Sequence, residues 1–302
     1  PGERYGMLRR VTARFNGDVN GYWLCDRGRF GYEFTNSGKR RVESGEIGRE
    51  PASWSKATNR AADMIREANG VIGIGSPRAS LEANYALKKL VGDENFSTGL
   101  CVSDQAGIDL ALDILRNGPA RTPSLAEVEQ ADVIVLLGID PTNEAPMLDF
   151  AIRQAMRKAP LDIARKLKIP DWDANAVATA LQGAEGKLYI ATPWAIKLEE
   201  ICLEAHHASP PAIAALATGI AEYISSRGAT CHAELDSASA LRPGQTLKQV
   251  QGDSMADRAA VDLREAHQPL IVTTISAGPN VIKAAANLAS ANALPNAPTV
   301  LL

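Results

Sequence analysis

Apolar residues recur along most of this chain in two patterns, one typical of amphipathic helices and one typical of buried strands. Helical spacing predicts helices at 55–69, 80–91, 103–117, 145–158, 211–225 and 280–293. Short apolar runs predict strands near residues 71, 132, 187 and 270. Because strands and helices alternate, the pattern predicts an α/β fold with a mostly parallel, doubly wound sheet and right-handed crossovers.

The first 35 residues follow a different pattern. Short β-type runs at Leu8–Phe15 and Gly21–Cys25 flank the turn dipeptide Asn16–Gly17, which predicts a small antiparallel unit. Seven of the 15 aromatic residues lie before residue 35, and residues 1–41 carry nine basic and four acidic side chains, a net charge of +5. The remainder carries −8, and residues 36–52 are expected to form a connector.

Residues 228–255 fit neither period. The segment resembles the translated interspersed repeats that some bacterial genomes carry in frame within unrelated genes, and an ordinary surface loop is the alternative. On either interpretation we expect an exposed segment that can be removed without loss of the sheet. Residue 1 is Pro, and residues 298–302 open as a strand, so the sequence is expected to be an internal piece of a longer chain.

Composition narrows the class of protein. The 302 residues are 45% hydrophobic and 22% charged, which is enough apolar material for one large or two ordinary domains. No apolar run reaches the roughly 18 residues of a membrane span, and no signal peptide is visible. The overall net charge of −3 argues against a nucleic-acid-binding protein. The four cysteines are far apart and form no CxxC pair, so a disulfide framework is not expected, and a reducing compartment is the simpler interpretation.

The segment Gly21–Tyr32 has the highest density of residues suited to redox chemistry. Cys25 ends an apolar run and precedes a basic, glycine-rich turn, which suits one ligand of an iron–sulfur cluster whose other three thiolates come from elsewhere. Backbone N–H groups of Gly28 and its neighbours would bond the sulfurs of the cluster, and aromatic neighbours would exclude water; these are Trp23, Phe30 and Tyr32. Arginines would offset the negative charge of the cluster; they are Arg4, Arg9, Arg10, Arg14, Arg27 and Arg29. Taken alone, Cys25 favours a buried structural cysteine over a cluster ligand, because a lone cysteine is among the most often buried residue types.

Several separated motifs resemble the large iron–sulfur subunit of bacterial NADH:quinone oxidoreductase, respiratory complex I. The resemblance rests on motifs that occur in the family's order and cover nearly the whole chain outside 228–255. They are Pro1-Gly-Glu-Arg-Tyr-Gly6, the Asn16–Asn20 turn, Leu24–Tyr32, Val71–Ser80, Leu90–Phe96, Asp132–Gly138 and Lys283–Ala289.

This resemblance implies a ligand and a domain organisation. In the family, three closely spaced cysteines precede the segment that matches Pro1–Gly6, and a fourth matches Cys25; together they bind an extra 4Fe–4S cluster. Residues 1–40 would then end a 4Fe–4S domain of the Mo/W bis-MGD type. Residues 41–302 would form a Rossmann-like, molybdopterin-oxidoreductase-like α/β domain with an insertion at 228–255. Related molybdopterin enzymes commonly carry a Lys after the fourth Cys, but Asp26–Arg29 contains none, so no molybdopterin is expected.

The resemblance also implies a role in an assembly. The large iron–sulfur subunit passes electrons from NADH toward quinone, beside the NADH/flavin-binding subunit and the quinone-module subunits. It is peripheral on the cytoplasmic face of the bacterial inner membrane. A chain of this length would be part of that enzyme without being catalytic alone, and no nucleic-acid partner or direct membrane span is expected.

Other motifs leave two alternatives open. A true molybdopterin-dependent oxidoreductase, similar to formate dehydrogenase, would place its cofactor near Gly75, Ser76 and Asp140. A structural α/β module without a redox role would use the Gly73–Arg78 turn only for close packing and Asp140 as a helix cap. The pairs His206–His207 and Cys231–His232 are not expected to bind metal; on a helix, adjacent histidines point about 100° apart.

Overall fold

The computed structural model describes residues 1–17, 19–39, 44–118, 122–181, 186–228, 255–291 and 299–301. The chain divides into two compact units. The first unit is Pro1–Arg14 with Leu24–Val102, and the second unit is Phe15–Trp23 with Ser103–Leu302. This division lies elsewhere than the expected domain boundary at residue 40, which stays a prediction.

The first unit contains three separate pairs of short strands and four helices. Its elements are β1 (Gly2–Arg4), β2 (Met7–Arg10), α1 (Asp26–Phe30), α2 (Glu33–Asn36), β3 (Gly45–Ile47), β4 (Glu50–Ala52), α3 (Trp54–Glu67), β5 (Gly73–Ile74), α4 (Leu81–Val91), the 3₁₀ turn η1 (Asp93–Asn95) and β6 (Phe96–Ser97). The predictions of α3 and α4 are confirmed. Each helix has a serine cap: Ser53 accepts from the N–H of Lys56, and Ser80 accepts from that of Ala83.

Two sequence expectations for the first 100 residues are wrong. The strand expected near residue 71 is only β5, which pairs in parallel with β6 and not with the main sheet. Glycines interrupt that run, so it offers few side chains for a sheet to bury. Gly21–Cys25 forms no strand; the antiparallel pair is β1 with β2, and the Asn16–Gly17 turn closes only an isolated bridge between Asn16 and Gly21.

The second unit contains the main sheet. Its elements are α5 (Val102–Asn117, all but its first residue), α6 (Leu125–Val128), β7 (Val133–Leu137), α7 (Pro141–Glu144), α8 (Pro146–Lys166), α9 (Ala174–Leu181), β8 (Lys187–Thr192), the 3₁₀ turn η2 (Lys197–Ile201), β9 (Glu204–His207), α10 (Pro210–Gly228), α11 (Met255–Glu265), β10 (Pro269–Thr273), the 3₁₀ turn η4 (Ile275–Ala277), α12 (Pro279–Ala289) and β11 (Thr299–Leu301). The strands run in the order β11-β10-β7-β8-β9, and every neighbouring pair is parallel.

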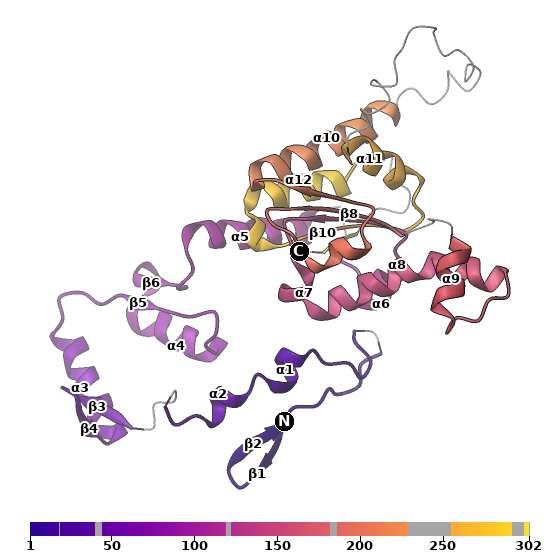
Figure 1. Ribbon diagram of the computed structural model, residues 1–302. Coiled ribbons are helices and arrows are strands. Elements are labelled where there is room, and N and C mark those ends of the chain that lie inside the picture. The colour runs from indigo at the N-terminus through magenta and orange to yellow at the C-terminus, as the bar shows by residue number, and fades with distance from the viewer. Residues whose placement is uncertain are drawn as a thin grey trace. The chain divides into compact units, whose positions relative to one another are not determined.

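Helices cover both faces of this sheet, which confirms the α/β class (Figure 1). Val133, Val135 and Leu137 of β7 pack in one core with α10, α11 and α12. Ile134 and Leu136 pack in the other core, with α6 and α8. All five residues of β7 and of β10 are buried, as their continuous apolar runs predict for strands covered on both sides.

The expected insertion lies almost wholly outside the described residues. Helix α10 continues to Gly228, α11 begins at Met255, and these two helices pack against each other. The expectations for Cys231 and His232 also lie outside the described residues. Within the part of the chain that the structure describes, no helix is both long and apolar enough to cross a membrane.

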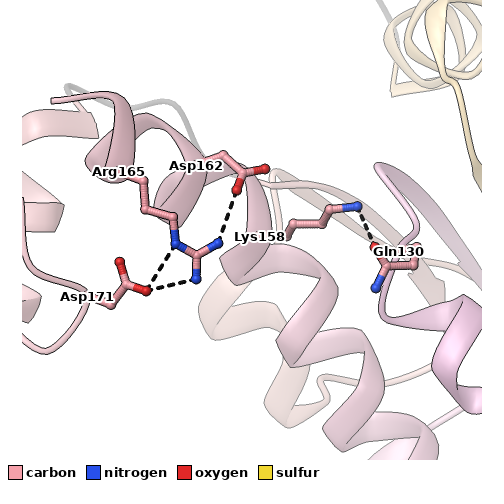
Figure 2. Close-up of polar contacts among 5 residues, drawn as sticks. All are labelled: Gln130, Lys158, Asp162, Arg165 and Asp171. Carbon is pink, nitrogen blue, oxygen red and sulfur yellow. Dashed lines mark hydrogen bonds and ion pairs between the residues drawn. The ribbon is translucent and has the colours of Figure 1, made fainter. Parts of the chain in front are cut away.

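Polar contacts tie the C-terminal half of α8 to its surroundings (Figure 2). The Arg165 guanidinium binds Oδ2 of Asp171 through Nε at 3.1 Å and Nη2 at 2.8 Å, and Asp162 through Nη1 at 3.4 Å. Lys158 donates to Oε1 of Gln130 at 2.7 Å. The hydrogen bond and the charge of Asp171 raise the pKa of Arg165 further above its ordinary value. These contacts hold the residues that follow α8 against the helix.

Candidate functional site

Cys25 lies at the start of a short helix and not at the end of a strand. It is the N-cap residue of α1, with an extended backbone (φ −66°, ψ 154°), and its Sγ accepts the N–H of Gly28 at 3.4 Å. The thiol is half-buried. The Gly28 N–H therefore already bonds the cysteine sulfur in this chain, although the expected strand before Cys25 is absent.

Gly28 fits closely against the residues that precede it. A Cβ added at this position would lie 3.1 Å from Cδ1 of Leu24 and 3.7 Å from Sγ of Cys25. The contact with Leu24 would be tight, whereas the contact with the sulfur would be an ordinary van der Waals one. A sulfur that accepts a backbone N–H is suited to bind a metal cluster, whose properties depend on such bonds.

Hydrogen bonds join the Cys25 segment to the arginine-bearing hairpin. Asn36, at the end of α2, accepts from the N–H of Leu8 at 2.9 Å and donates to its carbonyl at 2.8 Å. The Tyr32 hydroxyl donates to the carbonyl of Arg9 at 2.6 Å. These bonds link β2, which carries Arg9 and Arg10, to the residues that follow α1, the helix with Arg27 and Arg29.

Two of the three aromatic residues that are expected to exclude water from the cluster are mostly exposed in this chain. Trp23 is 63% exposed and Phe30 is 61% exposed. The Tyr32 ring is half-buried, but its hydroxyl serves to bind Arg9. The Trp23 ring instead contacts Phe150 of α8, with ring centroids 5.5 Å apart.

The other candidate metal ligands are dispersed. Among the described residues, no three His, Cys, Asp or Glu side chains come together in a way that could hold a metal ion. Cys101 is exposed, and the Cys202 thiol donates to the carbonyl of Glu199 at 3.4 Å. Cys25 is therefore a single thiol ligand, and this fits a cluster only if other cysteines complete the set.

His206 and His207 lie on the strand β9 and not on a helix. Adjacent residues of a strand point to opposite faces, so the two rings diverge even more than helical neighbours would. Nε2 of His207 lies 2.9 Å from Oε1 of Glu199. Burial pushes the pKa of Glu199 up, but the bonds from His207 and from the Ile196 N–H outweigh it and leave this pKa below its ordinary value.

Backbone N–H groups of the Gly73–Arg78 turn already form hydrogen bonds within the chain. The N–H of Gly75 donates to Ser97 at 2.8 Å, that of Ser76 to Oδ1 of Asn84 at 3.0 Å, and that of Arg78 to Oγ of Ser76 at 3.2 Å. A Cβ on Gly75 would lie 2.5 Å from Oδ1 of Asn84. The glycine therefore allows close packing, as the structural interpretation expects, and the turn is poorly arranged to bind phosphate.

Asp140 follows β7 at the carboxyl edge of the sheet. β8 and β9 lie on one side of β7 and β10 on the other, so Asp140 stands where the strand order reverses, the usual ligand position in such sheets. Asp140 is the N-cap residue of α7, as expected, but its side chain makes no capping bond: Oδ2 accepts from Asn143 at 2.7 Å, and Oδ1 is buried without a hydrogen-bond partner. Glu144 lies beside it and accepts from the hydroxyl of Thr274 at 2.9 Å.

Glu144 and Thr274 did not emerge from the sequence as site residues. The signal that could have found them is topological, because Thr274 follows β10 and Asp140 follows β7, and these strands are neighbours. At the opposite, amino edge a polar cavity of about 260 Å³ is lined by Asp132, Lys158 and His267 among others. Its Asp132 already accepts from the N–H groups of His267 and Gln268, at 2.7 and 3.0 Å.

Comparisons with known proteins agree with the motifs. Residues 46–169 match the family model described as molybdopterin oxidoreductase. The chain is similar to the subunit of NADH-quinone oxidoreductase designated G in Pseudomonas putida (38% identical), Escherichia coli K12 (38%) and Shewanella oneidensis (40%). Each alignment covers 96% of this chain and 31% of the relative, so the chain spans about a third of the length of these relatives.

One solved structure resembles the fold. The formyltransferase/hydrolase complex FhcABCD from Methylorubrum extorquens contains a chain that matches 83% of this one with a TM-score of 0.51 at 17% identity, and 57% of that chain is covered. At this identity the likeness concerns the fold alone. The resemblance to the NADH-quinone oxidoreductase subunit, in contrast, is confirmed by sequence similarity over nearly the whole chain.

Proposed function

We propose that this chain is part of the large iron–sulfur subunit of an NADH-quinone oxidoreductase, and that it supplies Cys25 as the fourth ligand of a 4Fe–4S cluster. When bound, such a cluster accepts and releases one electron at a time. Cys25 would hold it through its thiolate, while the Gly28 N–H stabilises negative charge on the sulfur. The observation that carries the proposal is this N–H···S geometry at the cysteine that the motifs select.

The rest of the chain would act as a scaffold. Its Rossmann-like sheet would form most of a molybdopterin-oxidoreductase-like domain at 41–302, after the end of a 4Fe–4S domain at 1–40. Within the full complex, electrons would pass from NADH toward quinone, beside the NADH/flavin-binding subunit and the quinone-module subunits. The assembly would be peripheral on the cytoplasmic face of the bacterial inner membrane, and this chain alone would not be catalytic.

Electron paramagnetic resonance of the full-length reduced protein tests the ligand. Cys25→Ser is expected to weaken or abolish one 4Fe–4S signal, because serine oxygen is a harder and poorer ligand for iron–sulfur chemistry. Matched changes at the other cysteines, Cys101→Ser, Cys202→Ser and Cys231→Ser, should leave every signal unchanged. If the signal survives Cys25→Ser and disappears with one of the others, the assignment is wrong; if the full-length protein binds no iron, the chain is a structural module.

One observation favours a second candidate function, that of a true molybdopterin-dependent oxidoreductase. The partnerless Oδ1 of Asp140 lies at the carboxyl edge of the sheet, where a donor from a bound ligand would satisfy it. Against this stand the internally bonded amides of Gly75 and Ser76. Metal analysis of the full-length protein separates the two: molybdenum or tungsten supports the second candidate, and iron alone opposes it.

A further inference from the structure

The elements β5, α4 and β6 of the first unit form a strand–helix–strand unit with parallel strands. Ile74 of β5 lies opposite Ser97 of β6, and the N–H of Gly75 donates to the carbonyl of Ser97 at 2.8 Å. The helix α4 packs on both strands (Figure 1). Among the residues that the structure describes, neither strand pairs with a third one. Parallel strands normally belong to larger sheets that are covered on both faces, and a pair of strands by itself is marginally stable.

The helix α4 covers one face of this pair. A Cβ added to Gly73 would lie 2.9 Å from Cγ2 of Val91 and 3.0 Å from Cγ of Leu87, which are both residues of α4. Because successive side chains of a strand alternate between faces, Ile72 and Ile74 lie on the other face. Their side chains are 75% and 67% exposed. This isoleucine face, defined by Ile72 and Ile74, is therefore apolar and mostly uncovered.

The edge of β5 that faces away from β6 has the backbone groups that another strand needs. Gly75 directs its N–H toward β6, and successive residues direct their backbone groups to opposite edges. The N–H and carbonyl of Ile74 therefore point to the outer edge. In the complete sheet of the second unit, β7 has a strand on each side and helices on both faces, and its Ile134 and Leu136 are fully buried.

We propose that the isoleucine face and the outer edge of β5 bind a parallel strand and an apolar helix from the same polypeptide, from outside residues 1–302. The inference rests on the proposed function, in which this chain is part of a longer subunit. The alignments cover 31% of the length of the relatives, so more than two thirds of each relative lies outside the matched segment. The helices of the second unit already bury apolar side chains on their own sheet, so the remaining length is the source of the cover.

Photo-crosslinking in the full-length subunit within its complex identifies what covers this face. With p-benzoylphenylalanine in place of Ile74, we expect mass spectrometry to find a cross-link to a peptide of the same polypeptide outside residues 1–302. The same group in place of Glu82, an exposed polar residue of α4, is the matched control and should not reach that peptide. Hydrogen exchange should show the Ile74 amide slowed at least about 100-fold relative to an unprotected amide.

Thermal unfolding of the same full-length subunit measures the cover independently. Ile72→Ser/Ile74→Ser should lower the melting temperature by several degrees, because it places two hydroxyl groups in an apolar interface. Ile72→Val/Ile74→Val is the conservative control and should lower it much less, since it keeps the face apolar. Equal melting temperatures of the wild type and the serine variant would show that water already covers these side chains.

Other results would also overturn the inference. Cross-links from position 74 that reach only residues 103–302, another subunit or a second copy in a cross-linked dimer would show a different occupant. No cross-link together with fast exchange of the Ile74 amide would show that the face is free. The intact mass separates these outcomes from failure of the proposed function: a subunit of only 302 residues would contradict that function, whereas a longer subunit with a free face contradicts this inference alone.

Discussion

Both units of this chain contain helices with apolar spacing, but only the helices of the second unit bury their apolar side chains in a core. In the first unit, Gly45 and Gly73 are the only buried residues among those the structure describes, and neither α3 nor α4 buries a single side chain. In the second unit, α12 alone buries six. Leu81 and Tyr85 of α4 are 82% and 59% exposed, whereas Ile134 and Leu136 of β7 are fully buried.

This difference shows that helix formation and core formation depend on separate features of a sequence. Serine caps and apolar spacing are local signals, and they predict where α3 and α4 form. A core also needs a surface of matching shape, and here the parallel sheet provides two such surfaces. The following predictions test the contrast between the units, from the largest expected effect to the smallest.

The largest difference in the free energy of unfolding is expected between a truncated buried strand residue of the second unit and a truncated exposed helix residue of the first. Ile134→Ala is expected to lower the free energy of unfolding by about 2–5 kcal/mol, because it leaves a cavity in the central strand of the sheet. Leu81→Ala in α4 should change it by less than about 0.5 kcal/mol, since that side chain is exposed. Urea unfolding followed by circular dichroism measures both. A large effect of Leu81→Ala would mean that α4 is buried in solution.

The second prediction compares the stability cost of a glycine-to-alanine change, at a glycine with positive φ, between the two units. Gly138→Ala should cost about 2–4 kcal/mol, because φ is +72° and the new Cβ would lie 2.6 Å from Cβ of Ala277. Gly6→Ala in the first unit, at φ +73° with nothing within 4 Å, should cost only the strain of about 1–2 kcal/mol. Thermal unfolding of the two variants checks the difference, and equal costs would contradict it.

A buried polar network in the second unit provides the third test. The Tyr189 hydroxyl donates to Oδ2 of Asp262 at 2.5 Å, and Lys187 lies 2.7 Å from Oδ1. Burial and then this hydrogen bond raise the pKa of Tyr189 above its ordinary value. Asp262→Ala should cost about 1–3 kcal/mol, because it leaves a hydroxyl unpaired in a buried region.

The double variant Asp262→Ala/Tyr189→Phe shows whether the unpaired hydroxyl is the cause. It should recover part of the loss, since no buried hydroxyl remains without a partner. Asp63→Ala in α3 is the matched control from the first unit; its pair with Arg66 is more than half exposed on both sides and should contribute little. A double variant as unstable as Asp262→Ala would contradict the explanation.

The smallest expected effect depends on pH. Because the pKa of Glu199 lies below its ordinary value of 4.5 in the folded chain, its contribution to stability is complete above that value and is lost as the pH falls through the lower, folded-state pKa. Glu199→Gln should therefore flatten the dependence of stability on pH below about 4.5 and change little near neutrality. Chemical unfolding at a series of acidic pH values measures this, and an unchanged slope would contradict it.

Much of the fold could be predicted from the sequence because its signals are local. The strand at 187–192 agrees with β8 to the residue, and the helix predicted at 280–293 is present as α12. The sequence pattern predicts no strand at residues 204–207, because β9 is a short edge strand with two histidines and no apolar alternation. The strand near 71 was assigned to the wrong sheet, since pairing partners are set by topology and not by the run itself.

The features of the candidate site likewise divide into those that local sequence predicts and those that depend on tertiary structure. The sequence by itself determined the chemistry available at residues 24–32: one thiol, a glycine with an N–H three residues later, and basic neighbours, all within one helical turn of each other. Only the tertiary structure decided that Trp23 meets Phe150 and that Asp140 keeps a partnerless oxygen beside Glu144 and Thr274. Trp23 with Phe150, and Glu144 with Thr274, lie more than 100 positions apart in the sequence, and the packing of helices on a parallel sheet brings them together, whereas caps, turns and periodicity act only between neighbours along the chain.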